Sequence, residues 1–133
     1  MADSAKRECT VLLVTRNGMG HADTSLQQEL FAKYLRLLDE NHMLPGGICF
    51  YTEGVKLVTE GSPVLDLLRS FEERGVPVLV CLTCLTHYGL VDKVKVGTVG
   101  GMPAIVAAPR SAVASCMGRS RYRKSYRPFV RWR

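Results

Sequence analysis

The sequence lacks any apolar run that approaches the roughly 18 residues of a membrane-spanning helix. Its opening residues, MADSAKREC, lack the apolar stretch of a secretory signal, so we expect a cytoplasmic protein. It also lacks internal repeats, which argues against repeat and collagenous classes. With 133 residues, of which 47% are hydrophobic, the chain has the size and composition of one globular domain with a substantial core.

Acidic residues are missing from the last part of the chain. Residues 119–133 contain seven of the 18 Lys and Arg residues and none of the 12 Asp and Glu residues, whereas residues 1–118 are nearly neutral. We therefore divide the chain into a domain over 1–118 and a basic tail over 119–133, interpreted as a disordered extension. Aromatic residues alternate with these cations, a composition that suits nonspecific contact with RNA or with an anionic membrane surface.

The hydrophobic pattern predicts strands that alternate with helices. Short apolar runs predict buried strands, helical periodicity with end signals predicts helices, and a fourth strand and a last helix are expected near the end of the domain. This order indicates an α/β fold with parallel strands joined by right-handed crossovers. The expected strands are 9–15, 48–52, 76–82 and 94–99, and the expected helices are 24–41, 62–75, 84–88 and 102–108, the last ended by Pro109.

Two helices carry detailed expectations. In the first, a capping box over 24–27 begins the helix, and its apolar stripe consists of Leu26, Leu30, Tyr34, Leu37 and Leu38. In the second, Ser62 is the expected N-cap, Pro63 the first helical residue and Gly75 the C-terminal cap.

The sequence also lacks an export signal before its five cysteines, so it gives no indication of an oxidising compartment in which disulfides form. We expect mostly reduced thiols. Cys9, Cys49 and Cys116 lie far apart in sequence and are interpreted as inert small hydrophobic residues. Cys81 and Cys84 differ from them because they form a CLTC pair where a strand gives way to a helix.

Cys84 is the strongest candidate for a reactive residue. At a helix N-terminus, backbone N–H groups and the helix dipole would stabilise its thiolate. Cys81 either resolves an oxidised or persulfidated Cys84 or packs in the core. Metal binding is not expected, because the CLTC pair has no second ligand pair at a suitable spacing, and no cofactor is expected.

Several residues at the same sheet edge are candidate binding residues, since ligands of parallel sheets bind outside the carboxyl ends of the strands. His87 follows Cys84 by three residues and either supports the thiolate or faces solvent. Asn17, Gly18 and Gly20 form either an anion-binding loop or a bare turn. Glu53 and Lys56 lie on a loop over 53–62 and are either binding or solvated charges.

Three segments together carry a resemblance to a known family. They are TRNGMGHADTSLQQEL, FYTEGVKLVTEGSPVLDLLRSFEERGVPVLVCLTCLTHYGL and DKVKVGTVGGM, within about residues 10–105. The sequence resembles the DsrE-like fold, most closely the carboxyl-terminal domain of the YedF-type sulfurtransferase-like selenium metabolism proteins. It departs from them at Leu82, where glycine is usual, and after Pro109.

The resemblance implies a three-layer α/β sandwich with a mostly parallel sheet of four to five strands, and a homo-oligomer. It implies that Cys84 carries sulfur as a persulfide with Cys81 as its companion, in sulfur relay or selenium metabolism. Its partners would then be sulfur donor and acceptor proteins, such as a TusA-like protein. Two other interpretations stay open: a non-catalytic oligomeric module that binds a small ligand or protein, and a dithiol oxidoreductase.

Overall fold

The structure of the protein, a computed structural model, describes residues 9–117, with side chains for 9–110. Four short strands, four α-helices and two 3₁₀ helices follow one another in this part of the chain. In chain order they are β1 (Val11–Val14), α1 (Thr24–Glu40), β2 (Gly47–Phe50), η1 (Thr52–Val58), α2 (Leu65–Glu73), β3 (Val78–Cys81), α3 (Leu82–Tyr88), η2 (Val91–Lys93), β4 (Thr98–Gly100) and α4 (Met102–Met117).

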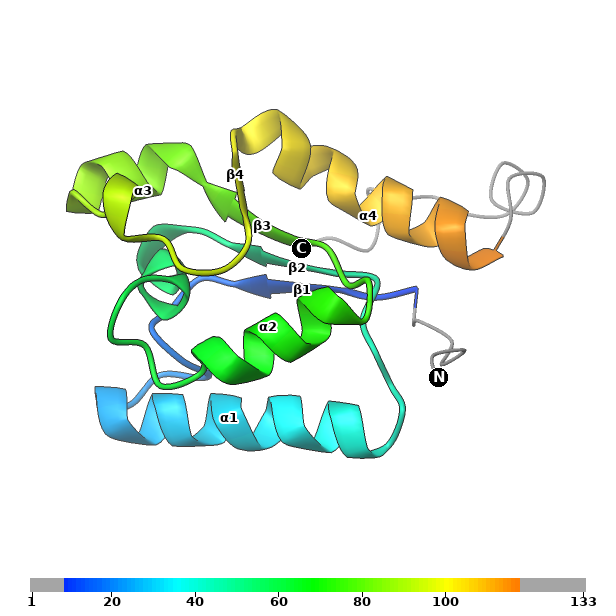
Figure 1. Ribbon diagram of the computed structural model, residues 1–133, viewed down its shortest axis with the longest axis horizontal. Helices are drawn as coiled ribbons and strands as arrows, with labels where there is room; N and C mark the ends of the chain where they lie inside the picture. Colours follow the sequence, from blue (N-terminus) through cyan, green and yellow to red (C-terminus); the bar gives the residue numbers. More distant parts are fainter. Residues whose placement is uncertain (1–8, 118–133) are drawn as a thin grey trace.

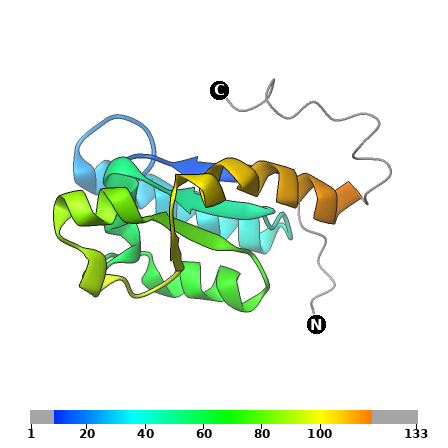
Figure 2. The same ribbon diagram turned by 90° about the horizontal axis from the view of Figure 1, so that it is seen from above.

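The strands form one parallel sheet in the order β1-β2-β3-β4. Leu12 pairs with Ile48, and Ile48 with Val78, so the carboxyl ends of the strands meet at one edge. Helices α1 and α2 cover one face and α4 covers the other, while α3 lies at the carboxyl edge (Figures 1 and 2). The expected three-layer α/β sandwich with a parallel sheet is therefore confirmed, with four strands.

Alternation along the strands divides the interior into two cores. Ile48 and Phe50 point to the larger core beneath α1 and α2, where Phe31 meets Phe50 edge to face at 6.4 Å between ring centroids. Cys49 and Cys81 point to the smaller core beneath α4, together with Val11 and Ile105. Two of the four buried residues in the smaller core are thus cysteines.

The predicted apolar stripe of α1 is correct only in part, because Leu38 packs against the larger core but three of its five residues are exposed. Gln27, Phe31 and Leu35 are the buried residues of this helix, while Leu26, Leu30 and Leu37 are exposed. Both sets have helical spacing, so periodicity alone does not choose between them. The choice is tertiary, because Phe31 packs on Phe50 and Gly18 lies against the backbone of Gln27.

The predicted capping box of α1 is also wrong by one residue. Asp23, just before the helix, is the N-cap, and its Oδ2 accepts a hydrogen bond from the N–H of Leu26 at 3.3 Å. The Ser25 hydroxyl donates to the same oxygen at 2.5 Å. An ionised carboxylate accepts two hydrogen bonds readily, so Asp23 caps one backbone N–H of the first turn and also holds the Ser25 side chain.

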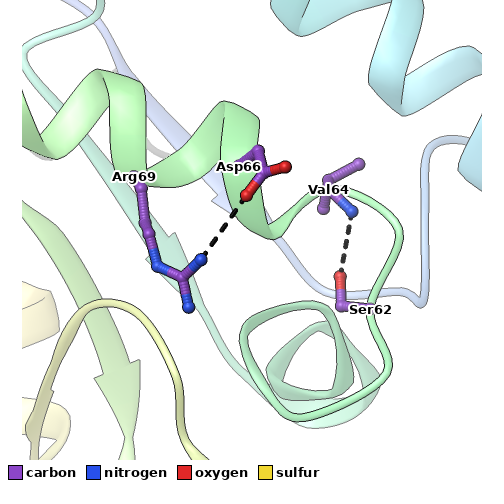
Figure 3. A network of polar contacts seen from close by, with 4 residues as sticks. All are labelled: Ser62, Val64, Asp66 and Arg69. Atoms are coloured by element: carbon purple, nitrogen blue, oxygen red, sulfur yellow. Dashed lines mark hydrogen bonds and ion pairs between the residues drawn. The ribbon is translucent and has the colours of Figure 1, made fainter.

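Helix α2 begins later than expected, at Leu65 (Figure 3). Val64 is its N-cap, and the Ser62 hydroxyl accepts a hydrogen bond from the Val64 N–H at 3.2 Å, so Ser62 organises the turn before the helix rather than capping it. At the other end Arg74 is the C-cap, and Gly75 follows with a φ of 93°. Such a φ favours glycine, which explains why Gly75 directly follows the helix.

Three further boundaries differ from the sequence prediction. The segment interpreted as a loop over 53–62 begins with the buried 3₁₀ helix η1, and β4 is shifted toward Gly100. Pro109 does not end α4, which continues to Met117. A proline removes one N–H group, but Ile105 and Ala108 pack in the smaller core against the sheet, which supports the helix over its first turns. The basic tail over 119–133 lies outside the described residues.

Candidate functional site

The end of β1, the start of η1 and helix α3 come together at the carboxyl edge of the sheet. The Tyr51 N–H donates to the Val14 carbonyl at 3.1 Å, which ties the start of η1 to the end of β1. Gly54 lies so close to this carbonyl that a Cβ atom there would overlap it. Only glycine allows this close approach, which explains why residue 54 is a glycine.

Cys84 faces this junction from α3. Its Sγ accepts a hydrogen bond from the backbone N–H of Thr52 at 3.0 Å, and its side chain is half-buried. Helix α3 begins at Leu82, two residues earlier than predicted, so Cys84 is the third helical residue and Cys81 is the N-cap. The predicted end of the helix is correct, because Gly89 adopts the left-handed conformation there.

Cys81 is close to Cys84 but differs from it in exposure. Only 1% of the surface of Cys81 is exposed, and both residues pack in the smaller core with Ile105. Both thiols are free. The structure thus gives Cys81 a place in the core and a contact with Cys84, so the two sequence interpretations of Cys81 are compatible.

The electrostatic setting of Cys84 differs from the expected one. Burial raises the pKa of the Cys84 thiol, the Thr52 N–H opposes this by favouring the thiolate, and the neighbouring Cys81 thiol raises the pKa further. The sequence interpretation expected a helix N-terminus to stabilise the thiolate. Helix α3 has only seven residues, and the group that favours the thiolate is instead one N–H from η1.

Thr52 is a site residue that the sequence analysis missed. It has a φ of 49°, which is unusual for a β-branched residue. Its hydroxyl oxygen lies 2.6 Å from the carbonyl oxygens of both Thr15 and Tyr51, so its single proton is shared between them and holds the turn that presents the N–H to Cys84. The sequence gives no signal for this role, because the hydrophobic pattern places Thr52 as the last residue of the expected strand 48–52.

Lys56 and His87 meet at a common ring beside this junction. The Lys56 ammonium lies 4.7 Å from the centroid of Tyr88, and the His87 ring packs against Tyr88 at 4.9 Å. His87 is exposed, and its observed contact is with Tyr88 rather than with Cys84, in agreement with the solvent-facing alternative. Glu53 is also exposed, as expected for a solvated charge.

The glycine loop has a packing role. Gly18 is buried with a φ of 148°, and a Cβ atom there would overlap the Gln27 backbone. The Met19 N–H donates to the Gln27 carbonyl at 2.9 Å, and the Asn17 side chain accepts from Gln28 at 3.2 Å. Gly20 is exposed and has open space around it. These contacts support the tight-turn alternative.

A shallow pocket of about 400 Å³ lies along β1 and the glycine loop. Gly18 and Gly20 line it with Arg16 and Tyr34, whereas Asn17, Cys81 and Cys84 do not. The glycine loop and the cysteine pair therefore belong to the same sheet edge but not to the same pocket.

The remaining cysteines agree only in part with the sequence interpretation. Cys49 is fully buried, and burial raises its pKa to about 11, as expected for an inert thiol. Cys9, in contrast, is disulfide-bonded. Cys116 lies where side chains are not described. Among the described side chains, no group of three or more His, Cys, Asp or Glu could hold a metal ion.

Comparison with known proteins assigns the chain to a family. A family model described as the DsrE/DsrF-like family matches residues 11–112. The chain therefore belongs to this family, which confirms the broader part of the resemblance. No curated protein matches it. Within residues 9–117, no helix has the length and apolarity needed to cross a bilayer.

Among solved structures, the chain is similar to a protein of unknown function, MTH1491, from Methanobacterium thermoautotrophicum. The two are 19% identical with a TM-score of 0.53, and the match covers 76% of this chain and 88% of the other. At this identity the likeness concerns the fold.

Proposed function

We propose that this protein is a sulfur carrier of the sulfurtransferase-like kind, with the persulfide formed on Cys84. The observation that carries the proposal is the hydrogen bond from the Thr52 N–H to the half-buried Cys84 Sγ at the carboxyl edge of the sheet. Families of the DsrE-like kind are linked to sulfur relay, which supports the same chemistry. Cys84 is the one free thiol of the described residues that is not buried.

The proposed chemistry needs only a thiolate and a sulfane-sulfur donor. The Cys84 thiolate attacks the outer sulfur of a donor persulfide, the donor S–S bond breaks, and the donor leaves as its thiolate. An acceptor thiolate then attacks the outer sulfur on Cys84 and restores the Cys84 thiolate. In both steps one S–S bond forms and one breaks, and the Thr52 N–H stabilises negative charge on Cys84 Sγ.

The partners in this proposal are a sulfur donor and a sulfur acceptor protein, one of them TusA-like, and a second copy of the chain. The proposal also includes a relation to the YedF-type proteins, a role in selenium metabolism and a location in the cytoplasm. Lys56 on η1 and His87 on α3 both contact Tyr88, where the Lys56 ammonium would attract an anionic persulfide or partner and His87 would offer a polar ring. Asn17, Gly18, Gly20 and Glu53 border the same edge as further binding candidates.

A dithiol oxidoreductase is the second candidate, and the contact between the Cys81 and Cys84 thiols favours it. The same two residues would then alternate between dithiol and disulfide without gaining sulfur. The two functions therefore differ in the mass of the product rather than in the residues involved.

Intact mass after treatment with sodium polysulfide separates them. Directly after a brief treatment, with the Cys9 disulfide left intact, wild-type and Cys81→Ser chains are expected to have gained one sulfur atom that cyanide removes, and Cys84→Ser is expected to have gained none. Cys49→Ser is the matched control and should behave like wild type, because Cys49 is fully buried. A Cys81→Ser chain that gains no sulfur, beside a wild type that only forms a disulfide, would support the oxidoreductase instead.

A further inference from the structure

The smaller core holds a thiol that the carrier function does not need. Cys81 is 1% exposed, so a protein donor cannot load it and a protein acceptor cannot reach it. It nevertheless packs beside Cys84, at the point where β3 passes into α3. The sulfur that Cys81 can react with is therefore the one on Cys84 of the same chain.

From this arrangement we infer that Cys81 is a resolving thiol, which converts the Cys84 persulfide into a Cys81–Cys84 disulfide and releases hydrosulfide. The inference rests on the proposed function, because it needs a persulfide on Cys84. It means that the site releases hydrosulfide. It also means that the Cys84 persulfide has a limited lifetime, because Cys81 consumes it.

The backbone geometry allows the bond. Cys81 is the N-cap and Cys84 the third residue of α3, and residues three apart in an α-helix have Cα atoms separated by about 5 Å. Disulfides occur at Cα separations of roughly 4.4–6.8 Å. The N-cap position helps, because Cys81 has extended dihedrals of −75° and 120° and is not held within the helix.

The step balances without an external oxidant. The Cys81 sulfur attacks Cys84 Sγ, the bond from Sγ to the outer sulfur breaks, and that sulfur leaves with the electron pair and the Cys81 proton as hydrosulfide. The outer sulfur is reduced, the Cys81 sulfur is oxidised, and Cys84 Sγ exchanges one S–S bond for another without a change of oxidation state. A dithiol reductant is then required to restore the two thiols.

Cys49 provides the matched comparison. It is a free, fully buried cysteine in the same core, but it lies on β2 and pairs with Leu79, two residues before Cys81 along β3. It therefore shares the burial and chemistry of Cys81 without its position beside Cys84. A resolving role predicts that the two cysteines differ sharply when each is replaced.

The test follows loaded protein over time. Chains with Cys81 and Cys84 as thiols and the Cys9 disulfide intact are exposed briefly to sodium polysulfide and desalted, after which intact mass and free sulfide are measured. Wild type and Cys49→Ala are expected to lose the added sulfur, to release an equal amount of sulfide, and to end two hydrogens lighter than the chain before treatment. Peptide mapping is expected to place the new disulfide between Cys81 and Cys84.

Cys81→Ser and Cys81→Ala are expected to keep the added sulfur and to release no sulfide. Two replacements are used because one of them could disturb this buried position. The inference is overturned if wild type keeps its sulfur as long as Cys81→Ser does, or if Cys81→Ser releases sulfide as wild type does. If no variant ever gains sulfur, the proposed function itself fails, and that outcome is distinct from both.

Discussion

At Cys84, opposing influences act on a single sulfur atom. Burial and the Cys81 thiol raise its pKa, and the Thr52 N–H lowers it. We predict that Cys81→Ala shifts the pKa of Cys84 downward, because it removes the neighbouring thiol and leaves the Thr52 hydrogen bond in place. Only the thiolate reacts, so the rise of the alkylation rate with pH should move to lower pH.

The measurement is the initial rate of iodoacetamide labelling of Cys84 between about pH 7 and pH 11, a range that spans ordinary thiol pKa values. Cys49→Ala serves as the control and should leave the profile in place. A profile that stays put in Cys81→Ala, or moves to higher pH, would show that Cys81 does not influence the Cys84 thiol.

The buried Cys49 makes a second prediction, on stability. Burial raises its pKa to about 11, whereas an unfolded thiol titrates near about 8.5. Between these values the unfolded chain loses the proton and the folded chain keeps it, so the free energy of unfolding falls as pH rises. One pKa unit corresponds to about 1.4 kcal/mol, so at about pH 10 the Cys49 contribution to this fall is about 2 kcal/mol.

Denaturant unfolding of wild type and Cys49→Ala at pH 7 and pH 10 isolates this contribution. Groups other than Cys49 titrate equally in both chains, so the stability advantage of wild type should shrink at pH 10. An advantage that is the same at both pH values would mean that Cys49 ionises equally in the folded and unfolded states.

At the residue scale, the sequence could indicate Cys84 and Cys81 but not Thr52. A CxxC pair after an apolar run is a local signal, and strand order places it at the carboxyl edge. The φ of Thr52 arises when η1 packs on β1, and its contact with Cys84 joins residues that are 32 apart in the sequence. The direction of the Cys84 pKa shift was also not predictable, because it depends mainly on burial, which is set by tertiary packing.

Among the elements, α1 offers a direct test of which face is buried. Leu35 is fully buried and Leu37 is 56% exposed, although both are leucines of one helix. Leu35→Ala is expected to lower the free energy of unfolding by about 2–5 kcal/mol, whereas Leu37→Ala should change it by less than about 0.5 kcal/mol. Urea unfolding measures both, and equal effects would contradict the orientation of the helix.

The junction of η1 with β1 gives a prediction that links stability to the site. Gly54→Ala places a methyl group against the Val14 carbonyl, so it should cost about 1–3 kcal/mol and shift the turn at Thr52. Cys84 labelling should then change as well. Gly47→Ala is the control, since its methyl group meets only ordinary contacts beyond 3.5 Å. Unaltered stability and labelling in Gly54→Ala would show that η1 and β1 can move apart to accommodate the methyl group without loss of stability.

Element types were easier to predict than element faces and ends. Strands appear as short apolar runs, and Gly89 ends α3 as predicted because it must adopt a left-handed conformation. The rotation of α1 and the persistence of α4 through Pro109 depend on what each helix packs against. Local signals do not decide that choice, since the predicted stripe of α1 and its buried residues both satisfy helical spacing.

At the scale of the whole molecule, the strand order determines which face each helix covers. Right-handed crossovers between neighbouring strands place α1 and α2 on the same face, so α4 alone covers the other (Figure 2). The larger core therefore holds most of the aromatic and aliphatic residues, and the smaller core is left with Cys49 and Cys81. This asymmetry is what places a buried thiol directly behind Cys84.

The same asymmetry bears on assembly. Helix α4 keeps large apolar side chains exposed, with Met102 at 46% and Val106 at 69%, and Leu82 and Val99 are exposed near its start. A homo-oligomer that covers this face would remove apolar surface from water and stabilise the association. We predict that sedimentation at micromolar concentration gives a mass above the 14.7 kDa of one chain.

Val106→Glu is expected to reduce that mass toward 14.7 kDa, because burying an unpaired carboxylate costs more than the apolar contact returns. Leu37→Glu is the matched control, since Leu37 is similarly exposed but lies on α1, on the opposite side of the sheet. It should leave the assembly intact. A wild-type monomer would contradict the predicted oligomer, and equal weakening by both variants would contradict the placement of the contact on α4.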